Sequence, residues 1–244
     1  MKYDIERLRN DADYYGEYGS QFLSNSDIGV LLSDPKSYGI PTPDHPNLVK
    51  GRYFHQSILE PDKVKDFPIV EASNRNTKIY KEYIEANGME VAMLRAEADE
   101  LDACVLAMTS NLDFYDGIRQ EGNQYEVPMI KEIKGRIWKG KADIVCTDKV
   151  IDLKTTSDIT KFHYSAKTYN YDSQCYIYEQ LFGKPLVFYV VDKVTKVLGI
   201  FKPTEEFIKR GEEKAIRALE LYDKYYGEFK WADANNYFIE QDLY

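Results

Sequence analysis

Residues 140–156 read GKADIVCTDKVIDLKTT, and this stretch decides how the chain folds. The run from Val150 to Leu153 is apolar except for one acid, and the residues before it are also rich in strand formers. The stretch therefore predicts a β-hairpin that turns near residues 147–149. Three of its residues are not required by a simple scaffold and are candidates for function: Asp143, Asp152 and Lys154.

The alternation of side chains along a strand places Asp152 and Lys154 on one face of the hairpin. A two-residue loop at positions 147–148 would pair Ile144 with Ile151, and so Asp143 with Asp152. Directly opposed residues lie roughly 4.5–5.5 Å apart at Cβ, which is close enough for two carboxylates to hold one divalent cation. A loop one residue longer or shorter would shift this pairing.

The two facing carboxylates have two interpretations. Like charges on apolar strands repel each other unless a hard cation with oxygen ligands neutralises them, and Mg²⁺ is the natural candidate. Alternatively, Asp143 and Asp152 are solvated positions on an edge hairpin, with Lys154 as their salt-bridge partner. The hairpin taken alone leaves both interpretations open.

The order of these motifs resembles a known family. Asp143, a hairpin and then Asp152-Leu153-Lys154 resemble the first acid and the D-x-K of the PD-(D/E)xK nuclease superfamily. Four further motifs are similar to those of its RecB/RecE-like phage exonuclease branch: a Q-x-x-x-Y helix at Gln174–Tyr178, a G-x-x-x-H helix at Gly51–His55, the L-E-P of residues 59–61, and an opening segment at residues 24–35. Together the motifs cover about residues 20–190.

The resemblance implies an α/β fold, with a central mixed β-sheet flanked by helices in a restriction-endonuclease-like core. We expect one nuclease domain over residues 1–244. Its core would span about residues 45–202, with an N-terminal extension (1–44) and a C-terminal helical segment (203–244).

The resemblance also implies a metal site. Asp143 and Asp152 would be the main ligands of Mg²⁺, with Mn²⁺ as an alternative ion, and the backbone carbonyl of Leu153 would complete the shell. His55 would bind through one ring nitrogen while a partner holds the other; in isolation it reads as a packed core residue. Glu126 would contact the metal or its water, or else be an exposed residue of an edge strand next to Pro128.

The remaining roles are catalytic. Lys154 would orient or deprotonate the attacking water, with its pKa lowered by the nearby cation. Gln174 and Tyr178 lie four residues apart on a helix, so they project together and would position DNA or order the site. The alternative for these two is a polar patch on an exposed helix.

Composition narrows the class of protein. The chain has 244 residues, of which 43% are hydrophobic and 30% charged, and it contains neither a signal-peptide pattern nor an apolar run long enough to span a membrane. We therefore expect a cytoplasmic protein without a membrane. The net charge of −9 counts against nonspecific coating of nucleic acid and favours a processing enzyme with a local basic patch. The three cysteines are too few for a zinc knuckle, a disulfide framework or a four-cysteine cluster.

The function that follows is a Mg²⁺-dependent exonuclease acting on DNA with free ends, in phage or prophage recombination or in repair. Similar enzymes are often ring-shaped homo-oligomers and work with a single-strand annealing protein, so both partners are expected. The alternatives are an endonuclease of the same superfamily and a non-catalytic DNA-binding protein that keeps the fold.

The chain also predicts the surrounding elements. Residues 1–20 read as an extended or partly ordered lead-in, and residues 111–123 as irregular. Helices are expected at residues 27–32, 48–60 (capped by Asn47), 78–86, 91–108, 172–182 and 204–225. Further strands are expected at residues 124–133, 186–191 and 196–201.

Overall fold

The fold is built on a five-stranded mixed sheet. The structure is a computed structural model that describes residues 3–239. The strands lie side by side in the order β3, β4, β5, β6, β7. They span β3 (Gln124–Ile133), β4 (Arg136–Val145), β5 (Val150–Thr156), β6 (Leu186–Asp192) and β7 (Leu198–Phe201). Strands β5 and β6 run parallel and the other neighbours run antiparallel. The predicted α/β fold with a central mixed sheet is confirmed.

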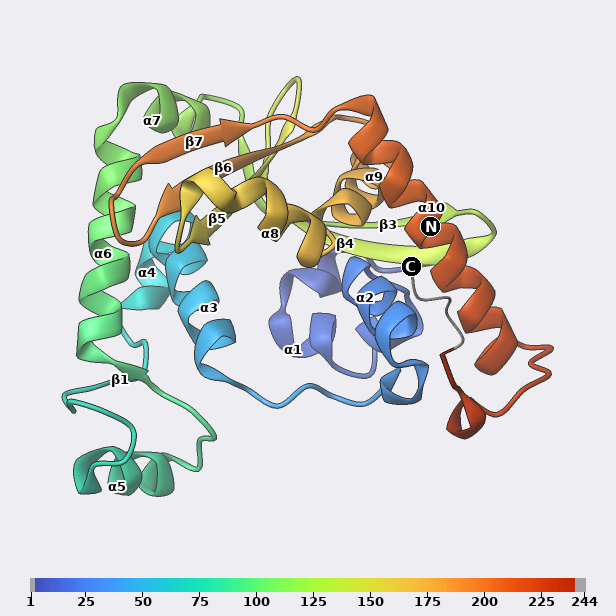
Figure 1. Cartoon of the computed structure of the whole chain (residues 1–244). Helices are drawn as coiled ribbons and strands as arrows, with labels where there is room; N and C mark the ends of the chain where they lie inside the picture. The colour runs from blue at the N-terminus through green and yellow to red at the C-terminus, as the bar shows by residue number, and fades with distance from the viewer. Residues whose placement is uncertain (1–2, 240–244) are drawn as a thin grey trace.

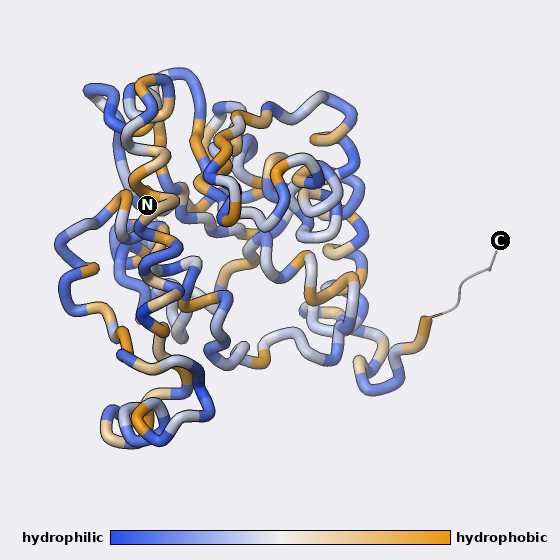
Figure 2. Tube along the Cα trace, turned by 60° about the vertical axis from the view of Figure 1, so that its left-hand side comes forward, coloured by the Kyte–Doolittle hydropathy of each residue, from blue (hydrophilic) through white to orange (hydrophobic). Residues whose placement is uncertain are grey.

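Helices cover both faces of this sheet (Figure 1). One face packs against α3 (Pro46–Leu59), α6 (Arg95–Ser110) and α7 (Leu112–Arg119), and α4 (Pro61–Val64) follows α3. The other face packs against α8 (Phe162–Thr168), α9 (Tyr171–Phe182) and α10 (Glu205–Tyr225). Figure 2 shows that the outer loops are mostly hydrophilic, while hydrophobic stretches lie mainly where elements meet. Burial of those stretches holds the layers together.

The N-terminal segment is ordered and packs on the sheet. It forms η1 (Glu6–Arg9), α1 (Asp11–Tyr15), η2 (Gly19–Gln21), α2 (Asn25–Ser33) and η3 (Pro35–Ser37). Leu23 bridges to Trp138 on β4, and the backbone N–H of Lys139 donates to the Leu23 carbonyl at 2.7 Å. The extended or partly ordered lead-in predicted for residues 1–20 is therefore wrong for residues 6–20, because these residues form short helices that fold against distant strands rather than on local periodicity.

Two other element predictions need correction. Residues 111–123 contain α7, whose N-terminus the Asn111 side chain caps by accepting from the Phe114 N–H. Phe114 and Ile118 are buried one helical turn apart, which is the signal the prediction missed. Helix α3 begins at Pro46, with Pro at the first helical position, rather than after a cap at Asn47.

A small lobe projects beside α6 (Figure 1). It consists of β1 (Ile69–Val70), α5 (Lys78–Asn87) and β2 (Met93–Leu94), with the two strands parallel. Helix α5 ends at Gly88, whose φ of 60° is left-handed as predicted for a C-terminal glycine. The helix expected from residue 91 starts four residues later because β2 comes first. The short helices η4 (Ile159–Lys161) and η5 (Ala234–Asn236) complete the described elements.

The hairpin formed by β4 and β5 has the predicted register from its turn as far as Ile144 and Ile151. Ile144 pairs with Ile151, Val145 pairs with Val150, and the Cys146 N–H donates to the Lys149 carbonyl at 2.9 Å. The ladder stops there, so Asp143 is not a backbone partner of Asp152. Instead, the Asp143 Oδ2 accepts the backbone N–H of Leu153 at 2.7 Å.

Among residues 3–239, no helix has both the length and the apolar character needed to cross a bilayer.

Candidate active site

Three carboxylates lie in one row across three neighbouring strands. On β3 and β4 the pairs Tyr125–Ile144 and Val127–Ala142 flank an unpaired position, where Glu126 faces Asp143. The register of β4 and β5 then brings Asp152 to the same level. We call Glu126, Asp143 and Asp152 the acid row.

The backbone is irregular where the row crosses it. Glu126 has a φ of 49°, a left-handed conformation that is unusual for a residue other than glycine, asparagine or aspartate. Ala142 and Ile144 would share a face in a regular strand, yet they pack into the clusters on opposite sides of the sheet. Side-chain alternation therefore reverses at Asp143. Local distortions of this kind re-aim side chains and are frequent at functional sites.

Asp152 is buried, and its carboxylate contacts side chains from α9 and β5. Only 4% of the residue is exposed. Gln174 of α9 donates from Nε2 to Oδ1 at 2.7 Å, and the Lys154 Nζ lies 2.5 Å from Oδ2. Lys154 therefore pairs with Oδ2 as a buried ion pair, while Gln174 satisfies Oδ1. Removal of either partner would leave a buried charge short of a partner, which is costly.

His55 lies on α3 and reaches the acid row from the face of the sheet opposite to α9. Its Nε2 lies 3.1 Å from the Asp143 Oδ2, and its Nδ1 lies 2.8 Å from the Gly51 carbonyl. Gly51 thus fixes the orientation of the imidazole through its backbone. A Cβ at Gly51 would meet no atom within 4 Å.

The buried charges shift one another's pKa values. Burial raises the pKa of Glu126 to about 7, and the Asp143 carboxylate adds to this shift. Burial opposes ionisation of His55, but Asp143 outweighs it and raises the imidazole pKa to about 9. For Asp143 itself, burial is outweighed by His55 and the pKa is lowered, whereas burial raises the pKa of Asp152. Perturbed groups concentrated in this way are typical of functional sites.

Lys154 is an ion-paired ammonium. Burial alone would lower its pKa, but Asp152 outweighs burial and raises it. The expected lowering depends on a bound cation, and without one the direction is the opposite. The Lys154 Nζ also lies 5.1 Å from the ring centroid of Tyr171 at the start of α9.

Gln174 and Tyr178 project together from α9, as predicted, but they reach different targets. Gln174 contacts Asp152, whereas the Tyr178 hydroxyl donates to the Lys141 carbonyl on β4 at 2.9 Å. The close approach of α9 depends on Gly140, because a Cβ there would lie 2.6 Å from the Leu181 side chain. Gln174 thus belongs to the acid row's surroundings, while Tyr178 braces the strand that carries Asp143.

Sequence reasoning missed the contribution of the N-terminal segment. Arg9 donates to the carbonyls of Tyr125 and Glu126 at 3.4 and 3.2 Å. Lys141 pairs with Asp11 and lies 3.5 Å from the Glu126 Oε2. The only local signal was the position of Lys141 two residues before Asp143, since nothing near residue 10 predicts a contact with β3.

The donor set suits a hard divalent cation. Within residues 3–239 no three His, Cys, Asp or Glu side chains form a ready-made metal cluster; instead, His55 pairs with Asp143 and Lys154 with Asp152. The row of three carboxylates nevertheless fits an ion that takes oxygen ligands. The backbone of Leu153 lies beside this row through its N–H contact to Asp143.

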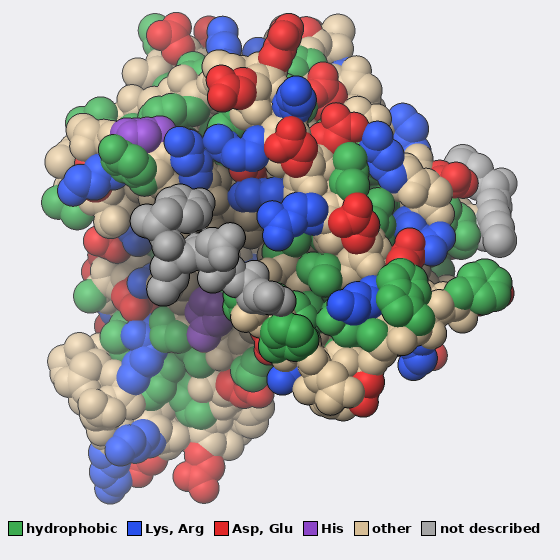
Figure 3. All heavy atoms as spheres, turned by 45° about the vertical axis from the view of Figure 1, so that its right-hand side comes forward, with side chains coloured by type: hydrophobic (Ala, Val, Ile, Leu, Met, Phe, Trp, Pro, Cys, Tyr) green, Lys and Arg blue, Asp and Glu red, His purple; other side chains and the backbone are tan. Residues whose placement is uncertain are grey.

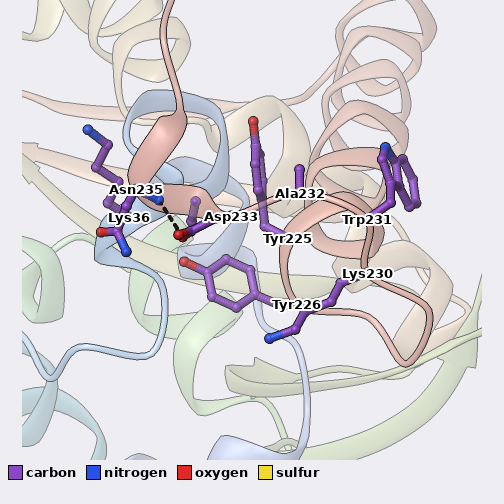
Figure 4. A pocket seen from close by; sticks show the side chains of 9 residues that line it. Lys36, Tyr225, Tyr226, Lys230, Trp231, Ala232, Asp233 and Asn235 are labelled. Carbon is purple, nitrogen blue, oxygen red and sulfur yellow. Dashed lines mark hydrogen bonds between the residues drawn. The ribbon is translucent and has the colours of Figure 1, made fainter.

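The surface around the fold is uneven in charge and shape. Figure 3 shows lysine and arginine side chains gathered on part of one face, although the net charge is −9. A hollow of ≈ 520 Å³ lies elsewhere, lined by η3, the end of α10 and the loop to η5 (Figure 4). It shares no residue with the acid row, and the chemistry of the site therefore does not depend on it.

The mixed sheet, the D-x-K on β5 and the acids around it define a nuclease of the PD-(D/E)xK superfamily. The chain belongs to the family described as a PDDEXK-like domain of unknown function (DUF3799), whose model matches residues 38–233.

Comparison with solved structures agrees with this fold. The crystal structure of a protein from Eubacterium rectale, described as a candidate exonuclease, is similar over 100% of this chain and 97% of its own, with a TM-score of 0.61 and 16% identity. A second solved structure aligns with 86% of this chain and with 82% of its own chain at 13% sequence identity. Its TM-score of 0.35 is too low to support an argument. Comparison with curated proteins gives no significant match.

Proposed function

We propose that this protein is a Mg²⁺-dependent DNA exonuclease that hydrolyses phosphodiester bonds from DNA ends. The observation that carries the proposal is the acid row, with the Lys154 ammonium 2.5 Å from the Asp152 Oδ2. The description of the Eubacterium rectale protein as a candidate exonuclease supports the choice of an end-directed activity.

The roles of the residues follow from their positions. Asp143 and Asp152 would hold Mg²⁺, or Mn²⁺ in its place, with the Leu153 carbonyl, His55 and Glu126 as further ligands. When bound, the ion would make water a better nucleophile at neutral pH and would neutralise charge on the phosphate.

The chain supplies the rest of the chemistry. Lys154, held as an ammonium, donates hydrogen bonds to a phosphate oxygen and stabilises the negative charge that develops there. Gln174 holds the Oδ1 of Asp152 and so fixes the orientation of this carboxylate. Tyr178 braces β4 so that Asp143 stays in the row.

The test uses end-labelled linear duplex and closed circular DNA, with Mg²⁺ or with EDTA. The variants are Asp152→Ala and, as a matched control, Asp148→Ala, because Asp148 lies in the same hairpin with a 72% exposed side chain. We expect wild type and Asp148→Ala to degrade linear DNA only with Mg²⁺, and Asp152→Ala to leave it intact. Cleavage of circular DNA would replace the exonuclease by an endonuclease, and binding without cleavage would indicate a non-catalytic DNA-binding protein.

The resemblance to RecB/RecE-like exonucleases adds two proposals about partners. One is a homo-oligomer, which light scattering of the purified chain would measure. The other is a single-strand annealing protein, which would bind the nuclease directly and receive the strand that digestion leaves. A monomer at all concentrations would contradict the first proposal.

A further inference from the structure

An aromatic path leads from the active-site lysine to the surface. The ring of Tyr171, half-buried, lies next to the Lys154 ammonium, and the ring of Tyr169 lies 6.1 Å further out with an interplanar angle of 38°. Tyr169 is 65% exposed. The two rings therefore form a step from the acid row to solvent, which we call the tyrosine step.

The backbone under the step is fixed before any ligand binds. Asn170, between the two tyrosines, is left-handed with a φ of 57°. Its side chain accepts a hydrogen bond from the Lys214 Nζ at 2.7 Å. Lys214 also reaches the buried carboxylate of Asp172 at 2.9 Å, which ties the turn to α10. A turn anchored in this way presents its rings with little loss of entropy on binding.

The surroundings of the step carry positive charge. Helix α8 ends at this turn and exposes Lys167, two residues before Tyr169. An exposed aromatic ring beside an ammonium is the combination that binds a base by stacking and its phosphate by charge. The acidic side chain that enters the turn, Asp172, is buried and already neutralised by Arg210 and Lys214.

We propose that the tyrosine step stacks unpaired nucleobases next to the phosphate held at Lys154, so that the substrate enters the site as a single strand. The inference rests on the proposed nuclease function and names the form of DNA that the same site takes. Tyr169 stacks on the base of the incoming nucleotide, and Lys167 pairs with the phosphate of that nucleotide. Tyr171, whose ring stacks on Phe188, lies between Tyr169 and the Lys154 ammonium and holds the step in place.

The test measures binding without cleavage. A single strand of about 12 nucleotides, which is within the range a stacking site covers, carries 2-aminopurine at one end and is titrated in EDTA and in Ca²⁺. We expect the 2-aminopurine fluorescence to be quenched on wild type. Tyr169→Ala should raise the Kd about tenfold, because base stacking on one ring is worth about that much. Tyr169→Phe should keep the wild-type Kd, since the ring remains.

Tyr164→Ala is the matched control. Tyr164 lies on α8 with a similar exposure of 63%, but its ring packs on His163 and is not part of the step. A Kd unchanged in Tyr169→Ala, or raised equally in Tyr164→Ala, would overturn the inference. The two proposals can be told apart. If Tyr169 determines binding of the single strand but no cleavage occurs with Mg²⁺, the tyrosine step is supported and the proposed nuclease activity is contradicted.

Discussion

The protein buries aspartates in two contrasting ways. Asp172, at the start of α9, is fully buried and satisfied: Arg210 and Lys214 contact it at 2.7 and 2.9 Å, and the Ser173 N–H donates to it. Asp152, 4% exposed, pairs with one cation, the Lys154 ammonium at 2.5 Å, and its pKa is raised by burial and by the neighbouring Asp143 carboxylate. The scaffold carboxylate thus lies between two cations, whereas the acid row sets carboxylates beside one another. The difference indicates which buried acids have a role beyond the fold.

The largest effect should come from Lys154. Lys154→Ala removes the ammonium that pairs with Asp152 and should lower DNA cleavage by about 10³-fold or more. Mg²⁺ binding should persist, because a competing cation is lost rather than a ligand. Cleavage rates and calorimetric Mg²⁺ titration measure the two outcomes, with Lys65→Ala as a control at an exposed lysine. Normal turnover in Lys154→Ala would remove this residue from the mechanism.

Neutralising the scaffold residue Asp172 and neutralising Asp143 of the acid row should change the free energy of unfolding by different amounts. Asp172→Asn should lower the free energy of unfolding by about 3 kcal/mol, because Arg210 cannot give up its charge. Asp143→Asn should change it by less than about 1 kcal/mol, since His55 can lose its proton and the repulsion within the row falls. Urea denaturation of the metal-free proteins measures both. Equal destabilisation would show that the row is scaffold as well.

Gln174 tests whether orientation of Asp152 matters. Gln174→Ala removes the 2.7 Å hydrogen bond to Oδ1 and should weaken Mg²⁺ affinity or activity about 10- to 100-fold, as loss of a ligand's supporting partner does. Gln180→Ala on the exposed side of the same helix is the matched control. An unchanged Mg²⁺ affinity and rate in Gln174→Ala would make its contact with Asp152 structural only.

The smallest predicted effect is a pH dependence of metal binding. Glu126, with a pKa of about 7, is protonated below that pH, so a cation must displace its proton there. Mg²⁺ affinity should therefore rise about tenfold per unit below about pH 7 from this group alone, and continue to rise towards pH 9 as His55 loses its proton. Glu126→Gln should flatten only the lower part of the curve. Calorimetry across this range decides whether Glu126 is a ligand, and a curve unchanged by the substitution would exclude it.

The sequence predicts most of the hairpin and little of what surrounds it. Strand alternation and loop length were enough to predict the pairing of Ile144 with Ile151 and the shared face of Asp152 and Lys154. They could not predict the reversal of alternation at Asp143, which depends on contacts across two neighbouring strands. The left-handed Glu126 was equally hidden, because its residue type does not favour that conformation and its neighbours read as a regular strand.

The roles of Gln174 and Tyr178 on α9 show the same limit to what the sequence predicts. A spacing of four residues predicted that Gln174 and Tyr178 project together, since helical geometry is local. Which atom each one reaches depends on how closely α9 packs on β4, and Gly140 sets that distance. The target of Tyr178 is a backbone carbonyl, which no side-chain pattern could have indicated.

The contact of Arg9 with Glu126 has a consequence for how the protein is made. The two residues are 117 positions apart, so the N-terminal segment leaves the ribosome long before its docking strand exists. Contacts at such separation form late and slow the folding of a chain. The backbone of β3 at Glu126 can therefore gain its contact with Arg9 only after the sheet has formed, when the first residues of the chain return to it.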